Sequence, residues 1–360
     1  MRQLWFLWCI LLALAFLIMY RSYSMPITHD EASTWLNYRH LNVWSCVSNP
    51  ACWGSANNHW LNTLLLQWTA TLFGDVPWAL RLPNVIAGIA YLYCALLFCT
   101  RYIQNNVLRF AGFVLLCAHV YLLDFFSLAR GYGMMASGVM WAMYSMLRYI
   151  EKQEWRWLVM AAMSLTFAIL SNFTALVPWM AVALCWLVWL IVQKKPDIIL
   201  RHFWIWLINA VFLVPVLIFP LKMLSKSGEF GWGSKNPFMM LIDLFVNLLY
   251  GASWFGNFTA LIFLLFILLL IVVIVWQGLY RKSMPNRSQI IFMALLFITT
   301  IAVIQFNQVV TGSMAPIGRK SIFLIPLLFG IVVLSLAALE NKKSGIVLGV
   351  VISLLVLWRI

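Results

Sequence analysis

Charged side chains are scarce in this sequence. Only 9% of its 360 residues are charged and only 10 are acidic, whereas roughly a quarter of a soluble domain is charged. The hydrophobic residues make up 64% of the chain. Because a soluble fold cannot hide so much apolar surface, the composition excludes a soluble protein and indicates that lipid surrounds the chain.

Nucleotide-binding loops are also missing. The sequence contains neither a G-x-G-x-x-G loop nor a Walker-type loop, so we expect no Rossmann or P-loop site. The net charge of +14 comes from basic residues in short connections between apolar runs. This is where the positive-inside rule puts them, so the charge indicates membrane orientation and we expect no nucleic-acid partner.

Apolar runs of membrane-spanning length recur along the chain. A spanning helix needs about 20 mostly apolar residues, and the pattern predicts an all-α polytopic fold with about eleven transmembrane helices. We see no internal repeat and no separate soluble domain, so we expect residues 1–360 to form a single transmembrane domain. No small-residue cleavage site follows the first run, which we therefore interpret as a retained helix. The predicted spans lie near 4–20, 80–100, 108–123, 131–149, 157–174, 175–192, 203–220, 258–279, 290–306, 321–339 and 344–358.

The connections at the two ends of these spans differ in charge and length. Basic residues predominate in the short connections, which we assign to the cytoplasm together with the amino terminus. The opposite connections include the long loops 21–79 and 221–257. Long loops on one side of a rigid scaffold usually carry function. The acidic residues expected on that outer face are Asp30, Glu31, Asp75, Asp124, Glu229 and Asp243.

Local structure is expected within both outer loops. Apolar residues recur at helical spacing over 60–73, which predicts an amphipathic helix lying in the membrane interface. We expect its apolar face to hold Trp60, Leu64 and Trp68, and Asn62 to lie off that face. Residues 238–254 predict a second such helix.

Two of the seven cysteines lie outside the predicted spans. Cys46 and Cys52 flank Asn49 and Pro50, which favour a turn. The compartment outside the membrane should be oxidising, so we predict a Cys46–Cys52 disulfide.

An acidic pair, Asp30-Glu31, follows the first predicted span by about ten residues. Adjacent carboxylates so close to the hydrocarbon are costly unless they are solvated or used. A carboxylate can take a proton from an acceptor or help to hold a cation. The alternative interpretation is a solvated helix start, with Thr28 or Asp30 as the cap.

The segment around this pair resembles a known family. Residues 27–35, ITHDEASTW, and 58–88, NHWLNTLLLQWTATLFGDVPWALRLPNVIAG, resemble the amino-terminal third of the GT-C membrane glycosyltransferases. That group includes the dolichyl-phosphate-mannose protein mannosyltransferases and the bacterial transferases that move 4-amino-4-deoxyarabinose onto lipid A. Residues 124–133 resemble the family's second outer loop. One departure is Asn57-Asn58-His59, where many relatives have a Pro-Pro or His-Pro-Pro-Leu element.

The resemblance implies a transferase that uses a polyprenyl-phosphate sugar, with Asp30 in the place of the catalytic acid. Such a donor is already activated, so the site needs a base for the acceptor and cations for the departing phosphate. We predict Asp30 as the base. The candidate donor-phosphate-binding residues are Arg130, Arg319, Lys320 and Arg81, and for each the alternative is snorkelling to lipid headgroups.

Other polar residues have less defined roles. Asp124 is a second candidate catalytic acid, which could orient the acceptor, pair with Arg130 or share a divalent cation with Asp30. His59 could ligate that metal or bind a sugar, or be a plain interfacial histidine. We also predict substrate contacts from Glu31 and from Lys226, whose glycine-containing loop could close as a lid.

These observations predict a glycosyltransferase of the bacterial inner membrane. It would move a sugar from a polyprenyl-phosphate donor to a lipid or cell-envelope glycan at the periplasmic face, with inversion at the anomeric carbon. The alternative is a transporter or flippase of lipid-linked sugars. A transporter would need charged residues along a path through the bilayer, and the predicted spans hold almost none at mid-depth, which favours the enzyme.

Overall fold

A computed structural model describes residues 5–42, 46, 48–53, 57–248, part of 261–280, 284–339 and 343–357. Within these residues the regular structure is helical, apart from an isolated bridge between Ser234 and Ala315. The prediction of an all-α chain is confirmed for this part of the sequence.

The described residues form the following helices. They are α1 (Trp5–Ser24), α2 (His29–Tyr38), η2 (Pro50–Trp53), α3 (Trp60–Phe73), α4 (Pro77–Tyr102), α5 (Asn106–Cys117), α6 (Val120–Phe126), α7 (Gly131–Lys152), α8 (Trp155–Ser171), η3 (Phe173–Ala175), α9 (Leu176–Val192), α10 (Pro196–Lys226), η4 (Glu229–Gly231), α11 (Pro237–Leu248), α13 (Arg287–Thr311), η5 (Gly318–Ser321), α14 (Leu324–Ala338) and α15 (Lys343–Leu357).

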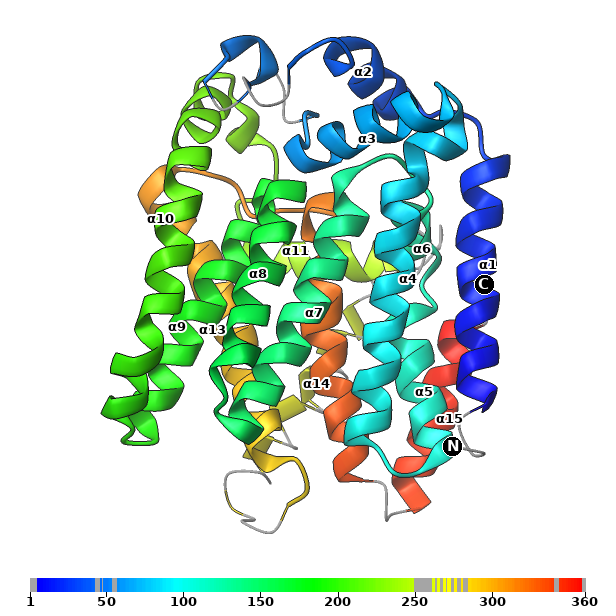
Figure 1. Cartoon of the computed structure of the whole chain (residues 1–360). Helices are drawn as coiled ribbons and strands as arrows, with labels where there is room; N and C mark the ends of the chain where they lie inside the picture. Colours follow the sequence, from blue (N-terminus) through cyan, green and yellow to red (C-terminus); the bar gives the residue numbers. More distant parts are fainter. Residues whose placement is uncertain are drawn as a thin grey trace.

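The long helices run side by side, and two short helices lie across one end of the bundle (Figure 1). These are α2 and α3, and we call this end the α2/α3 end. The connections between α7 and α8 and between α9 and α10 lie at the opposite end, where α1 also begins. The longest structured connections therefore gather at one end of the bundle.

Several helices have the length and apolar character of membrane spans. Among the described residues these are α1, α4, η3 with α9, α10 and α13; α5 and α6 add a sixth if they form one span despite the 59° bend between them. Helices α8, α11 and α14 are apolar but shorter. The count of eleven stays a prediction, and the expected span 258–279 lies partly outside the described residues.

Several predicted boundaries differ from the structure, and two of them affect the site. Helix α10 continues to Lys226, although we expected the span to end at residue 220 and a loop to follow. The predicted span 108–123 is two helices that break at Ala118 and His119. Periodicity marks the apolar part of a helix and misses polar end turns and internal breaks.

Helix α3 forms over the predicted residues, but Asn62, which we expected on its polar face, is packed inside the protein. Asn62 is fully buried. On the expected apolar face Trp60 and Leu64 are also buried, whereas Trp68 is 54% and Leu72 73% exposed. The Asn62 side chain donates to the Ala129 carbonyl and accepts from Asn84. In a lipid-facing protein an apolar face can point outward and a bonded amide inward, so the amphipathic pattern does not identify the packed side.

Candidate functional site

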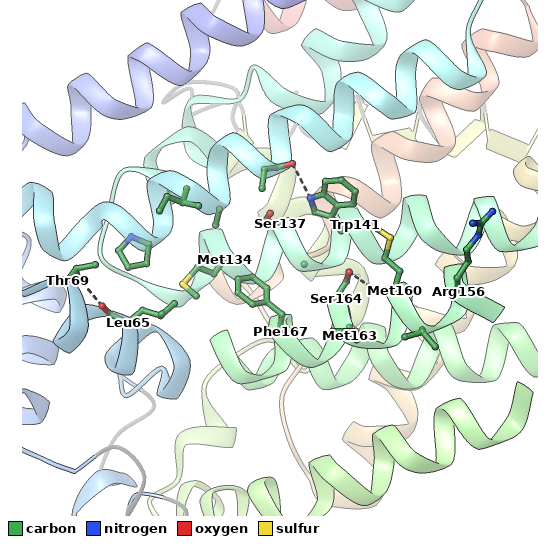
Figure 2. A pocket seen from close by; sticks show the side chains of 16 residues that line it. Leu65, Thr69, Met134, Ser137, Trp141, Arg156, Met160, Met163, Ser164 and Phe167 are labelled. Carbon is green, nitrogen blue, oxygen red and sulfur yellow. Dashed lines mark hydrogen bonds between the residues drawn. The ribbon is translucent and has the colours of Figure 1, made fainter. Parts of the chain in front are cut away.

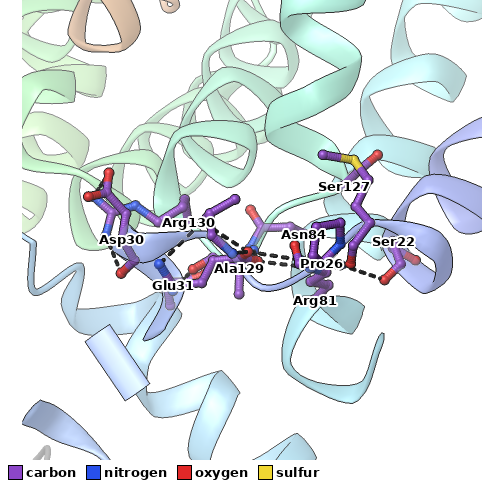
Figure 3. A network of polar contacts seen from close by, with 12 residues as sticks. Ser22, Pro26, Asp30, Glu31, Arg81, Asn84, Ser127, Ala129 and Arg130 are labelled. Carbon is purple, nitrogen blue, oxygen red and sulfur yellow. Dashed lines mark hydrogen bonds and ion pairs between the residues drawn. The ribbon is translucent and has the colours of Figure 1, made fainter. Parts of the chain in front are cut away.

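Helix α2 carries both predicted acids at the α2/α3 end, where they point to different surroundings (Figure 3). Thr28 caps the helix in a capping box with Glu31, which satisfies backbone groups at the helix start. Successive residues of a helix are rotated by about 100°. Asp30 therefore faces one set of partners while Glu31 faces another.

Glu31 forms a buried ion pair with Arg81 of α4. The two carboxylate oxygens each accept from Arg81, at 2.8 Å, and the side chains are 1% and 0% exposed. Glu31 also accepts from the Ala129 backbone N–H at 2.7 Å. Burial alone would raise the pKa of Glu31, but Arg81 and the backbone donors outweigh it, so its pKa lies below the ordinary value.

The remaining N–H groups of Arg81 are also used. They donate to the backbone carbonyls of Ser22, Met25 and Pro26, so all five guanidinium N–H groups have acceptors. This geometry does not support the prediction that Arg81 binds a donor phosphate or that Glu31 contacts a substrate. The pair instead ties the end of α1, the start of α2, and α4 together.

Asp30 lies between two other arginines. Its Oδ2 atom contacts Nη1 of Arg319 and lies 3.7 Å from Nη2 of Arg130. His29 is 96% exposed and its Nδ1 lies 3.9 Å from Oδ1 of Asp30. Burial alone would raise the pKa of Asp30, but the charges of Arg130 and Arg319 outweigh it, so its pKa lies below the ordinary value.

Arg130 is held by neutral partners as well as by charge. It donates to the Thr34 hydroxyl at 2.9 Å, to the Asn57 side chain at 3.0 Å and to the Asp30 carbonyl at 3.3 Å. Its side chain is 2% exposed. The arginine is therefore a fixed cation beside Asp30.

The next two residues bring Arg130 close to the end of α8. A Cβ atom on Gly131 would lie 1.9 Å from the carbonyl oxygen of Ser171, so this crossing requires a glycine. Tyr132 follows, and its ring lies 5.8 Å from the guanidinium carbon of Arg130 and 5.6 Å from that of Arg319. We did not single out Tyr132 from the sequence, because a tyrosine at a span start is common.

Arg319 comes from the η5 turn, far along the chain. The preceding Gly318 N–H donates to the Asp243 carboxylate of α11, which anchors this turn. The Arg319 side chain is 42% exposed. Asp243 was predicted only as an outer-face acid, and nothing in its local sequence indicates this role.

A cavity of about 530 Å³ adjoins this cluster. Its polar lining includes His59, Tyr132, Asn172, Glu229 and Lys320, and Trp232 also faces it. Its apolar lining is drawn from α8, α9, α10 and α13: Leu170, Leu176, Val177, Met180, Leu221, Leu224 and Val303. The cavity can therefore hold a molecule with a polar and an apolar part.

The hydrogen bonds around His59 fix its form. Asn172 accepts through its oxygen from the Thr174 backbone N–H, so its amide nitrogen faces His59 Nδ1, at 3.3 Å. The proton of a neutral ring then lies on Nε2, which has no partner among the described residues. Burial, aided by Arg130 and Arg319, holds the pKa of His59 well below its ordinary value, so the ring is neutral.

Asp124 lies elsewhere in the network. Its carboxylate pairs with Arg21 of α1, a partner that was not among the alternatives considered from the sequence. Among the described residues, no three His, Cys, Asp or Glu side chains are grouped closely enough to hold a metal ion. The candidate metal ligands Asp30, Asp124 and His59 thus do not form a site together, and we derive no step through a metal.

Of the remaining predicted residues, only Lys320 lines the cavity. Its Nζ donates to the Trp232 carbonyl at 3.4 Å. Lys226 is exposed in the last turn of α10 and does not line the cavity. Cys46 and Cys52 form a disulfide, with Cα atoms 5.4 Å apart, in a small apolar cluster that also contains Trp53 and Trp60.

A separate groove of about 790 Å³ runs between α3, α4, α7 and α8 (Figure 2). Its lining is almost entirely apolar from Leu65 of α3 to Met163 and Met160 of α8, and Arg156 lies at its far end. The groove therefore has the character of a surface for hydrocarbon chains.

The comparisons with known proteins agree with this architecture. Residues 60–220 match the family model described as dolichyl-phosphate-mannose-protein mannosyltransferase. No curated protein matches the sequence. Two crystal structures of ArnT from Cupriavidus metallidurans share the fold. The apo structure has a TM-score of 0.53 at 13% identity, and the structure bound to undecaprenyl phosphate has 0.56 at 15%.

These alignments cover 93% and 96% of the chain but only 60% and 62% of the ArnT chains. The family model includes Arg81, Asp124 and Arg130, and it stops short of Asp30 and Arg319. The resemblance to the GT-C membrane glycosyltransferases is thus confirmed by the family model over residues 60–220 and by the ArnT fold over most of this multi-pass chain.

Proposed function

We propose that the chain is a glycosyltransferase that takes a sugar from a polyprenyl-phosphate donor, with Asp30 as the general base. The observation that carries this proposal is the cluster of Asp30, Arg130 and Arg319 beside a cavity with polar and apolar walls. Paired guanidinium groups suit a phosphate leaving group. The undecaprenyl phosphate bound by one ArnT structure is a lipid of the proposed class.

The reaction needs few groups. Asp30 takes the proton of the acceptor hydroxyl, whose oxygen forms a bond to the anomeric carbon. The bond from that carbon to the phosphate oxygen breaks, and its electron pair leaves with the polyprenyl phosphate. Arg130 and Arg319 stabilise the departing charge. A single displacement of this kind inverts the anomeric configuration.

Asp30 must lose its partner before it can act, because an ion-paired carboxylate of low pKa is a weak base. Lys320 and the neutral His59 are proposed to contact the donor from the cavity wall. Asp124 is paired with Arg21, and we assign it no direct part in the chemistry.

The acceptor is proposed to be a lipid or cell-envelope glycan at the periplasmic face of a bacterial inner membrane. The groove in Figure 2 supports a lipid, because its apolar lining reaches α3, the helix that opens with Trp60 beside the cavity.

The test compares envelope glycolipids by mass spectrometry in cells with the wild-type chain, with Asp30→Asn and with no chain. We expect the wild type to add a glycan substituent that both other strains lack. Full transfer by Asp30→Asn would remove Asp30 as the base. A substituent that persists in all three strains would contradict the transferase. If the strain without the chain lost only the movement of lipid-linked sugars across the membrane, the flippase would be favoured.

A further inference from the structure

We propose that Arg130, Arg319 and Tyr132 form a seat for a phosphate oxyanion, and that the Asp30 carboxylate fills this seat until a phosphate displaces it. This inference rests on the proposed function and adds an order of events to it. In this order, the binding of the donor phosphate to the arginines is also the step that releases Asp30 to act as the base.

The geometry of Asp30 is that of a bound anion. A single oxygen, Oδ2, faces both guanidinium groups, in contact with Arg319 and 3.7 Å from Arg130. Both guanidinium carbons also lie within 6 Å of the Tyr132 ring centroid, so one aromatic ring contacts both cations. The same two cations should bind a phosphate more tightly than the Asp30 carboxylate, because a phosphate offers more acceptor oxygens and more negative charge.

The two sides of the seat differ in freedom. Arg130 is buried and bonded to Thr34 and Asn57, so it stays in place whether or not Asp30 is present. Arg319 and Asp30 are 42% and 27% exposed. A half-exposed pair contributes little to stability, so an incoming phosphate can replace it at small cost.

The adjacent pair shows the contrast. Glu31 and Arg81 are almost fully buried, and every N–H of Arg81 has an acceptor. Replacing either partner there would leave a buried charge unpaired. Of two neighbouring acid–arginine pairs, one is closed to ligands and the other is open to them.

Displacement also changes the chemistry of Asp30. In the seat the carboxylate is stabilised as an anion by two positive charges. Once a phosphate takes those charges, Asp30 faces a negative neighbour, which favours its protonated form and makes it a stronger base. The base is therefore available when a donor phosphate is bound and masked when it is not.

The experiment measures the affinity of the full chain for undecaprenyl phosphate in lipid nanodiscs. Asp30→Asn removes the competing anion, so we expect this variant to bind about two- to tenfold more tightly than the wild type. Arg319→Gln removes half of the seat, and we expect about tenfold weaker binding. Asp75→Asn is the matched control, because it removes an exposed acid that pairs with Arg39 instead.

A double variant separates displacement from general repulsion. If Asp30 competes for Arg319, the gain from Asp30→Asn shrinks or disappears in the Arg319→Gln background. A gain of equal size in both backgrounds would overturn the seat, because it would reflect only one negative charge fewer. Asp30→Ala repeats the measurement without a hydrogen-bonding side chain, and thermal unfolding of each variant shows that the chain is folded.

The outcomes distinguish this inference from the proposed function. Suppose that the wild type binds undecaprenyl phosphate and that neither Asp30→Asn nor Asp30→Ala binds it more tightly. That result would overturn the displacement of Asp30 but leave the proposed donor intact. If folded wild type and variants all fail to bind undecaprenyl phosphate, the seat and the polyprenyl-phosphate donor are both wrong.

Discussion

Two consecutive carboxylates of one helix turn have opposite environments in this protein. Glu31 completes a buried pair with Arg81, whereas Asp30 is partly exposed and faces Arg130 and Arg319. Their chemical similarity says nothing about this difference. One carboxylate serves the fold, and the other is available for chemistry.

Replacing Glu31 by glutamine should destabilise the protein. The change leaves the buried Arg81 charge unpaired, and breaking a buried pair typically costs about 3–5 kcal/mol. Thermal unfolding in detergent measures the loss. The matched control is Glu154→Gln, which breaks the exposed pair with Arg156 and should have little effect; equal losses in both variants would contradict the structural role of Glu31.

The same pair predicts a dependence of stability on pH. The pKa of Glu31 in the folded chain lies below its ordinary value of 4.5. A carboxyl group of this kind contributes stability that is fully present above the unfolded pKa and is lost as the pH falls through the folded pKa. The stability difference between wild type and Glu31→Gln should therefore shrink below about pH 4.5. A difference that stays constant down to pH 3 would show that the carboxylate charge is unimportant.

At the scale of elements, the contact between α7 and the end of α8 positions the site. Gly131 allows the start of α7 to approach the end of α8. This approach places Arg130 and Tyr132 beside Asn172 and His59. Helix α3 enters the same contact through His59, the residue before its first turn. The site thus depends on where three helices begin or end.

Gly131→Ala should disturb this contact. The added Cβ would lie 1.9 Å from the Ser171 carbonyl oxygen and 3.0 Å from the His59 Cβ, and overpacking of this kind typically costs about 1–3 kcal/mol. We expect a lower unfolding temperature and reduced glycan transfer. Gly231→Ala is the control, because nothing lies within 4 Å of its added Cβ. Wild-type behaviour of Gly131→Ala would mean that the helices can separate freely here.

At the scale of the whole molecule, the candidate site lies at one end of the helical bundle. Asp30, Arg130, Arg319 and the cavity lie at the α2/α3 end, and the turn between α7 and α8, with Glu154 and Arg156, lies at the other. The candidate site is thus separated from this turn by the length of the bundle. This separation is what an enzyme acting on one face of a membrane needs.

The proposed orientation can be measured by labelling with a membrane-impermeant maleimide. Gly231→Cys at the α2/α3 end should react in intact spheroplasts, and Glu154→Cys should react only after the membrane is permeabilised. The wild type provides the background, because Cys9 is exposed on the surface of α1. The reverse labelling pattern would place the candidate site in the cytoplasm and would contradict the positive-inside assignment.

The sequence alone determined the class of protein and the segment that matters. Apolar runs gave the helical membrane fold, because a chain in lipid must satisfy its backbone hydrogen bonds within each helix. The scarcity of charge indicated a role for Asp30 and Glu31, because ionisable groups next to hydrocarbon usually have a function. Helix α3 also formed over the predicted residues, because a helix start and its apolar period are local properties.

The tertiary structure alone decided which charges meet. Asp30 and Arg319 are 289 positions apart, and Glu31 and Arg81 are 50 apart. The sequence could not show which candidate phosphate-binding cations are accessible, but packing buried Arg81 and left Arg319 42% exposed. Burial and pairing depend on how separate helices pack against one another, and no local pattern contains that information.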